Sequence, residues 1–307
     1  MSEPTARPTS WLMGRPYLLL SLTSLFWAGN IVVGRFAAEQ IPPFTLSFIR
    51  WAGAFAIVLP FALHHLARDW TAIRRQLGLM VVLSLTGFAA CNTIAYWSLQ
   101  YTQALNALLL QSSAPLFVAL FSLLLFGIRL TRAQGFGILV SMAGVMVILL
   151  RGDLATLATI RLNQGDVGFT LSIVIFGLYS ALAARRPAVH PLSFLAFTCG
   201  CGALFIVPAI GWEIAHEQWM TVNAATVLAL IYVTIFPSTL AYLFFNRGVE
   251  LIGANRAAPF FHLIPVFGSA LAIVFLGERP RLFHLIGYAL VLSGVFIAAR
   301  RASAAGR

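Results

Sequence analysis

Long apolar runs are the feature that most restricts what this chain can fold into. Ten runs of about 17 to 25 residues follow one another with short polar interruptions, and each can cross about 30 Å of hydrocarbon as a helix. None shows the alternating polarity of a membrane β-strand. We therefore predict an all-α integral membrane protein with transmembrane helices over residues 17–34, 43–63, 77–99, 104–126, 133–150, 168–184, 191–212, 224–245, 257–277 and 283–299.

Composition agrees with a chain held mostly in lipid. The sequence is 60% hydrophobic and 9% charged, whereas about a quarter of the residues in a soluble domain are charged. Its 20 basic residues, all arginine, punctuate the apolar runs and form no basic stripe, so we expect membrane lipid and no nucleic acid as a partner. Three cysteines lie inside apolar runs without His or Cys at a metal-site spacing, so we expect no metal and no cofactor.

The two halves of the sequence resemble each other. The stretch APLFVALFSLLLFGIR begins at Ala114 and IPVFGSALAIVFLGER begins at Ile264, a constant offset of 150 residues. Glycines and prolines along both halves match at similar offsets. We therefore predict two repeats, residues 1–150 and 151–307, with five helices each. Because five is odd, the second repeat must enter the membrane in the opposite sense, which makes the repeat inverted.

Arginine distribution sets the expected orientation. With the N-terminus in the cytoplasm, fourteen arginines lie in inside segments and five in outside segments. Cytoplasmic segments of membrane proteins are enriched in positive charge. We expect a multi-pass protein of the bacterial inner membrane with both termini cytoplasmic and the loop at 151–164 periplasmic.

Inverted repeats are typical of secondary transporters, in which one half rocks against the other to expose a central site alternately to each side. Several segments also resemble the EamA-type drug/metabolite transporters. These are FWAGN at 26–30, the run at 98–131 and the run LIPVFGSALAIVFLGERPRLFHLIGYALVLSGV at 263–295. Ile128 departs from the family, which usually has Glu there, so the matching Glu278 of the second repeat has no counterpart. We expect Glu278 to be structural, pairing locally with arginine or a helix N-terminus.

The resemblance implies ten helices, a central cavity built by the first, third and fourth helices of each half, and export of small metabolites. The pattern is most similar to bacterial amino-acid exporters, including the aromatic amino-acid exporter. Helical spacing selects polar or aromatic residues on the cavity helices. The predicted substrate-binding residues are Trp27, Asn30, Asn92, Tyr96, Gln111, Phe176, Tyr179, Ser238, Tyr242 and His262.

These side chains favour a neutral or zwitterionic solute with an apolar body. Arg50 is the only deep basic residue, and it lies on a helix that the resemblance places outside the cavity. Pure interhelical bonding remains an alternative role for Asn30 and Asn92. Other open alternatives are an exporter of a different substrate class, a channel, and a receptor or scaffold. We expect a monomer. We also expect that it is not an enzyme, because the sequence has no clustered aspartates or paired catalytic groups.

Energy coupling is expected to be absent. Proton-driven transporters usually keep a titratable group within the membrane. No carboxylate lies mid-span in the predicted helices, since Asp166 and the other aspartates are assigned to loops, and His262 is the only mid-span titratable candidate. We therefore expect a facilitator that lets its solute run down its own gradient.

Overall fold

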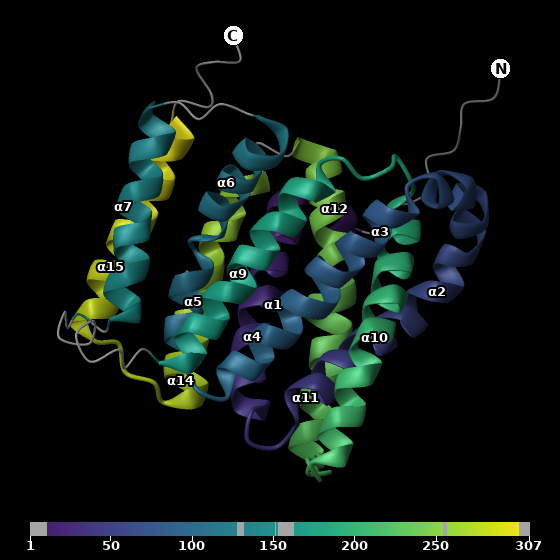
Figure 1. The fold of residues 1–307 in the computed structure, drawn as a ribbon, viewed down its shortest axis with the longest axis horizontal. Helices are drawn as coiled ribbons and strands as arrows, with labels where there is room; N and C mark the ends of the chain where they lie inside the picture. Colours follow the sequence, from purple (N-terminus) through teal and green to yellow (C-terminus); the bar gives the residue numbers. More distant parts are fainter. Residues whose placement is uncertain (1–10, 128–131, 151, 153–162, 254–256, 301–307) are drawn as a thin grey trace.

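The computed structural model describes residues 11–127, 132–150, 152, 163–253 and 257–300, and every regular element in these ranges is a helix (Figure 1). This confirms the all-α prediction for the described residues. Each of the ten predicted ranges contains helix. Six helices are long and apolar enough to cross a membrane, or seven when the bent pair α5 and α6 counts as one span, and three shorter apolar helices accompany them.

The elements of the first half precede a gap in the described residues, and those of the second half follow it. The first half contains η1 (Trp11–Gly14), α1 (Pro16–Ala37), α2 (Pro43–Arg75), α3 (Leu77–Ser84), η2 (Leu85–Ala90), α4 (Cys91–Leu99), α5 (Ala104–Gln111), α6 (Ala114–Phe126) and α7 (Arg132–Leu149). The second half contains α9 (Gln164–Ala183), α10 (Pro191–Ala215), α11 (Ala224–Ile235), η3 (Phe236–Leu240), α12 (Ala241–Ile252), η4 (Ala258–His262), α14 (Leu263–Leu276) and α15 (Leu282–Arg300).

Side-chain packing and proline set the ends of some helices, in addition to the length of the apolar run. α2 continues to Arg75, beyond its predicted end at residue 63, because its polar extension still buries Ile73 against Met80 of α3. The α5–α6 axis bends by 41°. Pro115 lies in the first turn of α6, where its missing N–H and fixed φ start a new helix and do not continue the old one.

α7 and α15, the last helices of the two halves, pack side by side at one edge of the molecule (Figure 1). A Cβ placed on Gly144 would lie 2.6 Å from the carbonyl oxygen of Gly287, so only glycine permits this approach. The Ser141 hydroxyl donates to the Val291 carbonyl at 3.2 Å. Ser141 and Val291 are themselves separated by the 150-residue offset. Equivalent positions of the two halves therefore meet in this contact.

α2 and α10 form a second antiparallel pair between the halves. At each end of the pair, a carboxylate of one helix accepts hydrogen bonds from the backbone at the start of the other. At one end the Glu213 carboxylate, which is fully buried, accepts from the backbone N–H groups of Phe44 and Thr45 at 2.7 and 2.8 Å. At the other end the Asp69 carboxylate accepts from the backbone N–H of His190 at 2.8 Å. Each helix start is thus capped by a side chain from the partner helix.

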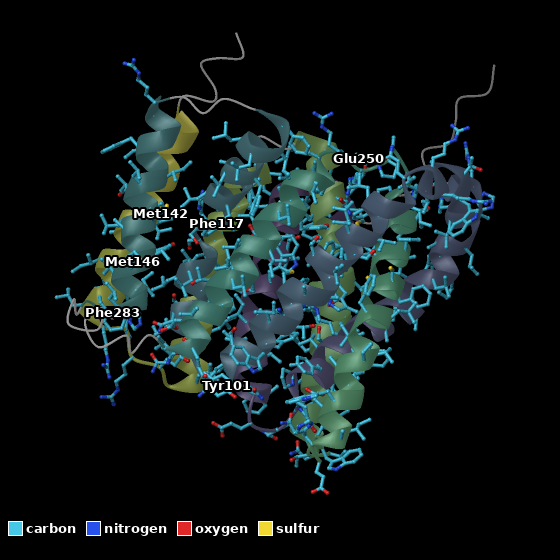
Figure 2. All side chains as sticks on the ribbon, viewed as in Figure 1. Tyr101, Phe117, Met142, Met146, Glu250 and Phe283 are labelled. Atoms are coloured by element: carbon cyan, nitrogen blue, oxygen red, sulfur yellow. The ribbon has the colours of Figure 1, made fainter. Side chains whose placement is uncertain are left out.

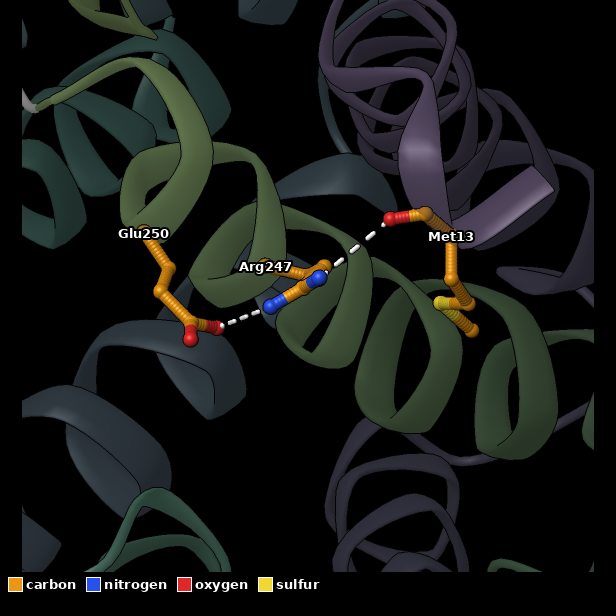
Figure 3. Close-up of polar contacts among 3 residues, drawn as sticks. All are labelled: Met13, Arg247 and Glu250. Atoms are coloured by element: carbon orange, nitrogen blue, oxygen red, sulfur yellow. Dashed lines mark hydrogen bonds and ion pairs between the residues drawn. The ribbon is translucent and has the colours of Figure 1, made fainter. Parts of the chain in front are cut away.

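The two ends of the described chain lie at the same end of the molecule. Arg247 near the end of α12 pairs with Glu250 at 2.8 Å and donates to the Met13 carbonyl in η1 at 3.3 Å (Figure 3). Glu250 lies at the end where α15 finishes, and Tyr101 and Phe283 lie toward the opposite end (Figure 2). This placement is compatible with the prediction that both termini face one side of the membrane.

Candidate functional site: a cavity between the two halves

A cavity of about 360 Å³ lies between the halves, within the size range of small-molecule sites. Helices of both repeats bound it, and α7 and α15 take no part. Eight of the ten predicted binding residues line the cavity. These are Trp27, Asn30, Asn92, Tyr96, Gln111, Phe176, Tyr179 and Tyr242. The other main members missed by the spacing argument are Arg50, Ser172, Arg186, Phe245, Asn246 and Phe261.

Aromatic rings form one wall of the cavity. The Trp27 ring stacks on Phe261 with centroids 5.3 Å apart and lies edge-on to Tyr242 at 5.8 Å. Phe245 contacts the same Trp27 ring at 5.6 Å. Three helical elements, α1, η4 and α12, therefore supply one apolar surface that suits a ring or a branched alkyl group.

Two predicted residues do not line the cavity. Ser238 was grouped with Tyr242 by α-helical spacing, but it lies inside the π-helix η3, where the extra residue per turn rotates it away. Its hydroxyl is fully buried and donates to the Val233 carbonyl at 2.6 Å. His262 ends the 3₁₀ helix η4, whose tighter turn brings Phe261 to the cavity in its place.

The third helix of each half contains a π-helical segment beside the cavity, η2 in one and η3 in the other. π-helical turns free backbone carbonyls, and side chains here use them. The Asn92 amide donates to the Gly87 carbonyl at 2.9 Å, and the Trp27 indole donates to the Pro237 carbonyl at 3.2 Å. These bonds fix the orientation of two cavity-lining side chains.

A polar cluster built on Arg50 closes the cavity toward α2. The Arg50 Nη1 donates to the Asn92 Oδ1 at 2.8 Å and to the Tyr96 hydroxyl at 2.9 Å. The Tyr96 hydroxyl in turn donates to the Asn30 Oδ1 at 2.6 Å. The expectation that Arg50 lies outside the cavity is therefore wrong. Its long side chain reaches from α2 between α4 and η3, which helix-by-helix assignment does not show.

A second buried polar cluster joins α5, α9 and α15. Asp166 lies in the first turn of α9 and is fully buried, so its assignment to a loop is wrong. The Asn106 amide donates to the Asp166 carboxylate at 3.0 Å, and its oxygen lies 2.7 Å from the His284 Nε2. The Thr102 hydroxyl also donates to Asp166. None of these four residues lines the cavity.

Glu278 caps a helix of the other repeat. Its carboxylate accepts from the backbone N–H groups of Ala104 and Leu105 at 2.7 and 2.8 Å, at the start of α5. Glu278 therefore pairs with a helix N-terminus, but the expectation of a local partner is wrong, because this helix start is 174 residues away in sequence. The negative carboxylate also complements the positive end of the helix dipole.

Known proteins resemble both halves of the chain. The model of the EamA-like transporter family matches residues 14–150 and 163–300. An "Uncharacterized transporter" of Archaeoglobus fulgidus is 27% identical over 285 residues, covering 92% of this chain and 96% of that protein. A "Probable amino-acid metabolite efflux pump" of Escherichia coli K12 is 25% identical, covering 91% and 93%. A solved structure, described only as a crystal structure of a protein, has 21% identity and a TM-score of 0.62 over 94% of this chain and 98% of its own.

Proposed function

Because the chain belongs to the EamA-like transporter family, we propose that it is a secondary transporter that exports small metabolites through the cavity between its halves. The observation that carries this proposal is the cavity itself, since helices of both repeats surround it. Rocking one repeat against the other exposes such a site to alternate sides of the membrane.

The expected solutes are aromatic or other hydrophobic amino acids and similar compounds with an apolar body. The wall around Trp27 and Tyr242 supports an apolar body, because aromatic rings make large contacts with other rings and with alkyl groups. Similarity to a protein named as an amino-acid metabolite efflux pump supports the same class.

The proposal includes ten transmembrane helices in the bacterial inner membrane, with both termini cytoplasmic. Its basis is the arginine bias of the sequence together with the packing of η1 beside the end of α12. Labelling of single cysteines with an impermeant maleimide should give the same side for the C-terminus and the α9–α10 loop, and the opposite side for the α10–α11 loop. Equal labelling of both loops from one side would contradict this topology.

Reconstituted transport tests the function. Purified protein in proteoliposomes should exchange internal unlabelled amino acid for external labelled amino acid, and counterflow should saturate with concentration. Aromatic amino acids should compete better than small polar ones. Flux that never saturates would indicate a channel, and no flux of any metabolite would indicate a receptor or scaffold.

A pair of variants connects this flux to the cavity. Tyr96→Ala removes a cavity-lining ring and the hydroxyl between Arg50 and Asn30, so transport should fall at least about tenfold. His262→Ala serves as the matched control because His262 is half-buried and lies outside the lining. Normal transport by Tyr96→Ala, with the protein folded, would contradict the assignment of this cavity as the route.

A further inference from the structure

Arg50 carries a positive charge deep in the molecule and has neutral partners. Its side chain is 3% exposed, and the hydrogen bonds to Ser238, Asn92 and Tyr96 are its polar contacts among the described residues. The guanidinium also lies over the Trp51 ring, 4.3 Å from its centroid. Burying an ion without an opposite charge is costly, so this position favours the arrival of an anion.

The cavity as a whole is positively charged. Arg50 and Arg186 are its charged lining residues, and no Asp or Glu is present among the residues that line it. Arg186 is exposed and lies at the mouth, between the ends of α9 and α10. A solute entering past Arg186 therefore meets one positive charge at the entrance and a second, less hydrated one in the interior. Both charges attract an anion.

The guanidinium has donors left for a ligand. Arginine carries five N–H donors; the Nε group bonds to Ser238 at 2.5 Å and Nη1 bonds to Asn92 and Tyr96. Nη2 makes no hydrogen bond within the described part of the chain. This nitrogen is also not completely enclosed by protein atoms, unlike the unbonded Trp51 Nε1 and Ser193 Oγ. Nη2 therefore faces accessible space, and the space next to Arg50 is this cavity.

We propose that Arg50 binds the carboxylate of the transported solute through Nη2, with the apolar body of the solute against the Trp27 wall. This inference rests on the proposed function and specifies its substrate class. Because no carboxylate lines the cavity, an ammonium group on the solute has no ion-pair partner there. The class is therefore monocarboxylates with an apolar body, in which the carboxylate is required and the amino group is dispensable.

Four ligands, each with a phenyl ring, test separately whether the carboxylate and the amino group are required. They are 3-phenylpropanoate, L-phenylalanine, L-phenylalaninamide and 3-phenylpropanamide, and binding is measured by isothermal calorimetry on protein in nanodiscs. Wild-type protein should bind 3-phenylpropanoate at least as tightly as L-phenylalanine. It should bind the acid about ten- to hundredfold more tightly than 3-phenylpropanamide, the range expected for one charge-assisted hydrogen bond.

Two variants remove the charge in different ways. Arg50→Gln keeps an amide donor and deletes the charge, whereas Asn92→Asp keeps Arg50 and places an internal carboxylate beside Nη1, where the present oxygen lies at 2.8 Å. In both variants the ratio of acid to amide affinity should fall to near one, with amide affinity changed less than about threefold. Arg247→Gln, which deletes an arginine that does not line the cavity, should leave the ratio unchanged.

The outcomes separate the two proposals. If wild-type protein binds the acid and the amide equally, the carboxylate inference is wrong and the cavity still functions as the site. If Arg50→Gln weakens acid and amide alike, Arg50 only holds α2, α4 and η3 together, and the inference is wrong. If none of the four ligands binds, the inference fails and the proposed solute class fails with it.

Discussion

At the scale of single residues, several buried polar side chains in this protein are held by partners that are distant in sequence. Glu213 is the strongest example, because its two oxygens accept three hydrogen bonds from Phe44 and Thr45, including one from the Thr45 hydroxyl at 2.7 Å. The carboxylate lies at the N-terminus of α2, where the helix dipole adds to the stabilisation. It connects α10 to α2 across the two repeats.

Glu213→Gln should therefore destabilise the fold. The amide presents an NH₂ group toward backbone N–H donors and loses the charge, so we expect the free energy of unfolding to fall by about 2–3 kcal/mol. The thermal midpoint in detergent measures this loss. Glu250→Gln is the matched control, since the Glu250 side chain is 68% exposed and such pairs contribute little. Equal midpoints for the two variants would contradict a stabilising role for Glu213.

At the scale of helices, the contact between α7 and α15 depends on glycine. Gly144→Ala would place a methyl group 2.6 Å from a backbone oxygen of α15, and overpacking of this kind costs about 1–3 kcal/mol. Gly135→Ala, on the same helix, meets nothing within 4 Å and should be neutral or stabilising, because alanine favours helix. A lower thermal midpoint for Gly135→Ala than for Gly144→Ala would contradict the packing described here.

The start of α10 should depend on pH. Burial, and next the stacked His65 ring 3.7 Å away, lower the pKa of His190, while Asp69 acts in the opposite direction. Neutral His190 accepts from the Leu192 N–H through Nδ1. Because the folded state lowers this pKa, the stabilisation is complete above the ordinary histidine value of about 6.5 and is lost as pH falls below it.

The thermal midpoint of unfolding is measured at several pH values from about 7.5 down to about 5.5. Wild-type protein should lose stability across this window, and His190→Asn, which keeps a capping acceptor, should reduce the loss. His216→Gln, at an exposed position at the far end of α10, is the control that should follow wild type. A wild-type midpoint that does not fall, or a His190→Asn variant that loses as much as wild type, would contradict the role of His190.

The sequence predicted helix positions well because bilayer thickness sets the length of an apolar run. Side-chain directions were predicted where the helix is regular, as at Trp27 in α1 and Phe176 in α9. They failed where the helix changes its pitch, since Ser238 lies in a π-helix and His262 in a 3₁₀ helix, and neither follows the 3.6-residue period. The position of Arg50 depends on how far a flexible side chain reaches between neighbouring helices, and periodicity contains no such information.

At the scale of the whole molecule, the facilitator hypothesis stays a prediction about energy coupling. Initial flux in proteoliposomes should be the same with and without an imposed pH or sodium gradient. Accumulation of solute above equilibrium under a proton gradient would contradict it. In that case the cluster of Asp166, Asn106 and His284 would be the first group to substitute, because it is buried and joins helices of both repeats.

The central claim is that solute crosses through the cavity between the repeats, and blocked counterflow tests it most directly. In a variant without the native cysteines, Ser180→Cys places one thiol in the cavity lining, and Thr221→Cys places one in the exposed α10–α11 loop. Maleimide modification should abolish counterflow by the Ser180→Cys protein, excess solute should protect it, and the labelled Thr221→Cys protein should transport normally. Undiminished counterflow after complete labelling of Ser180→Cys would contradict the account.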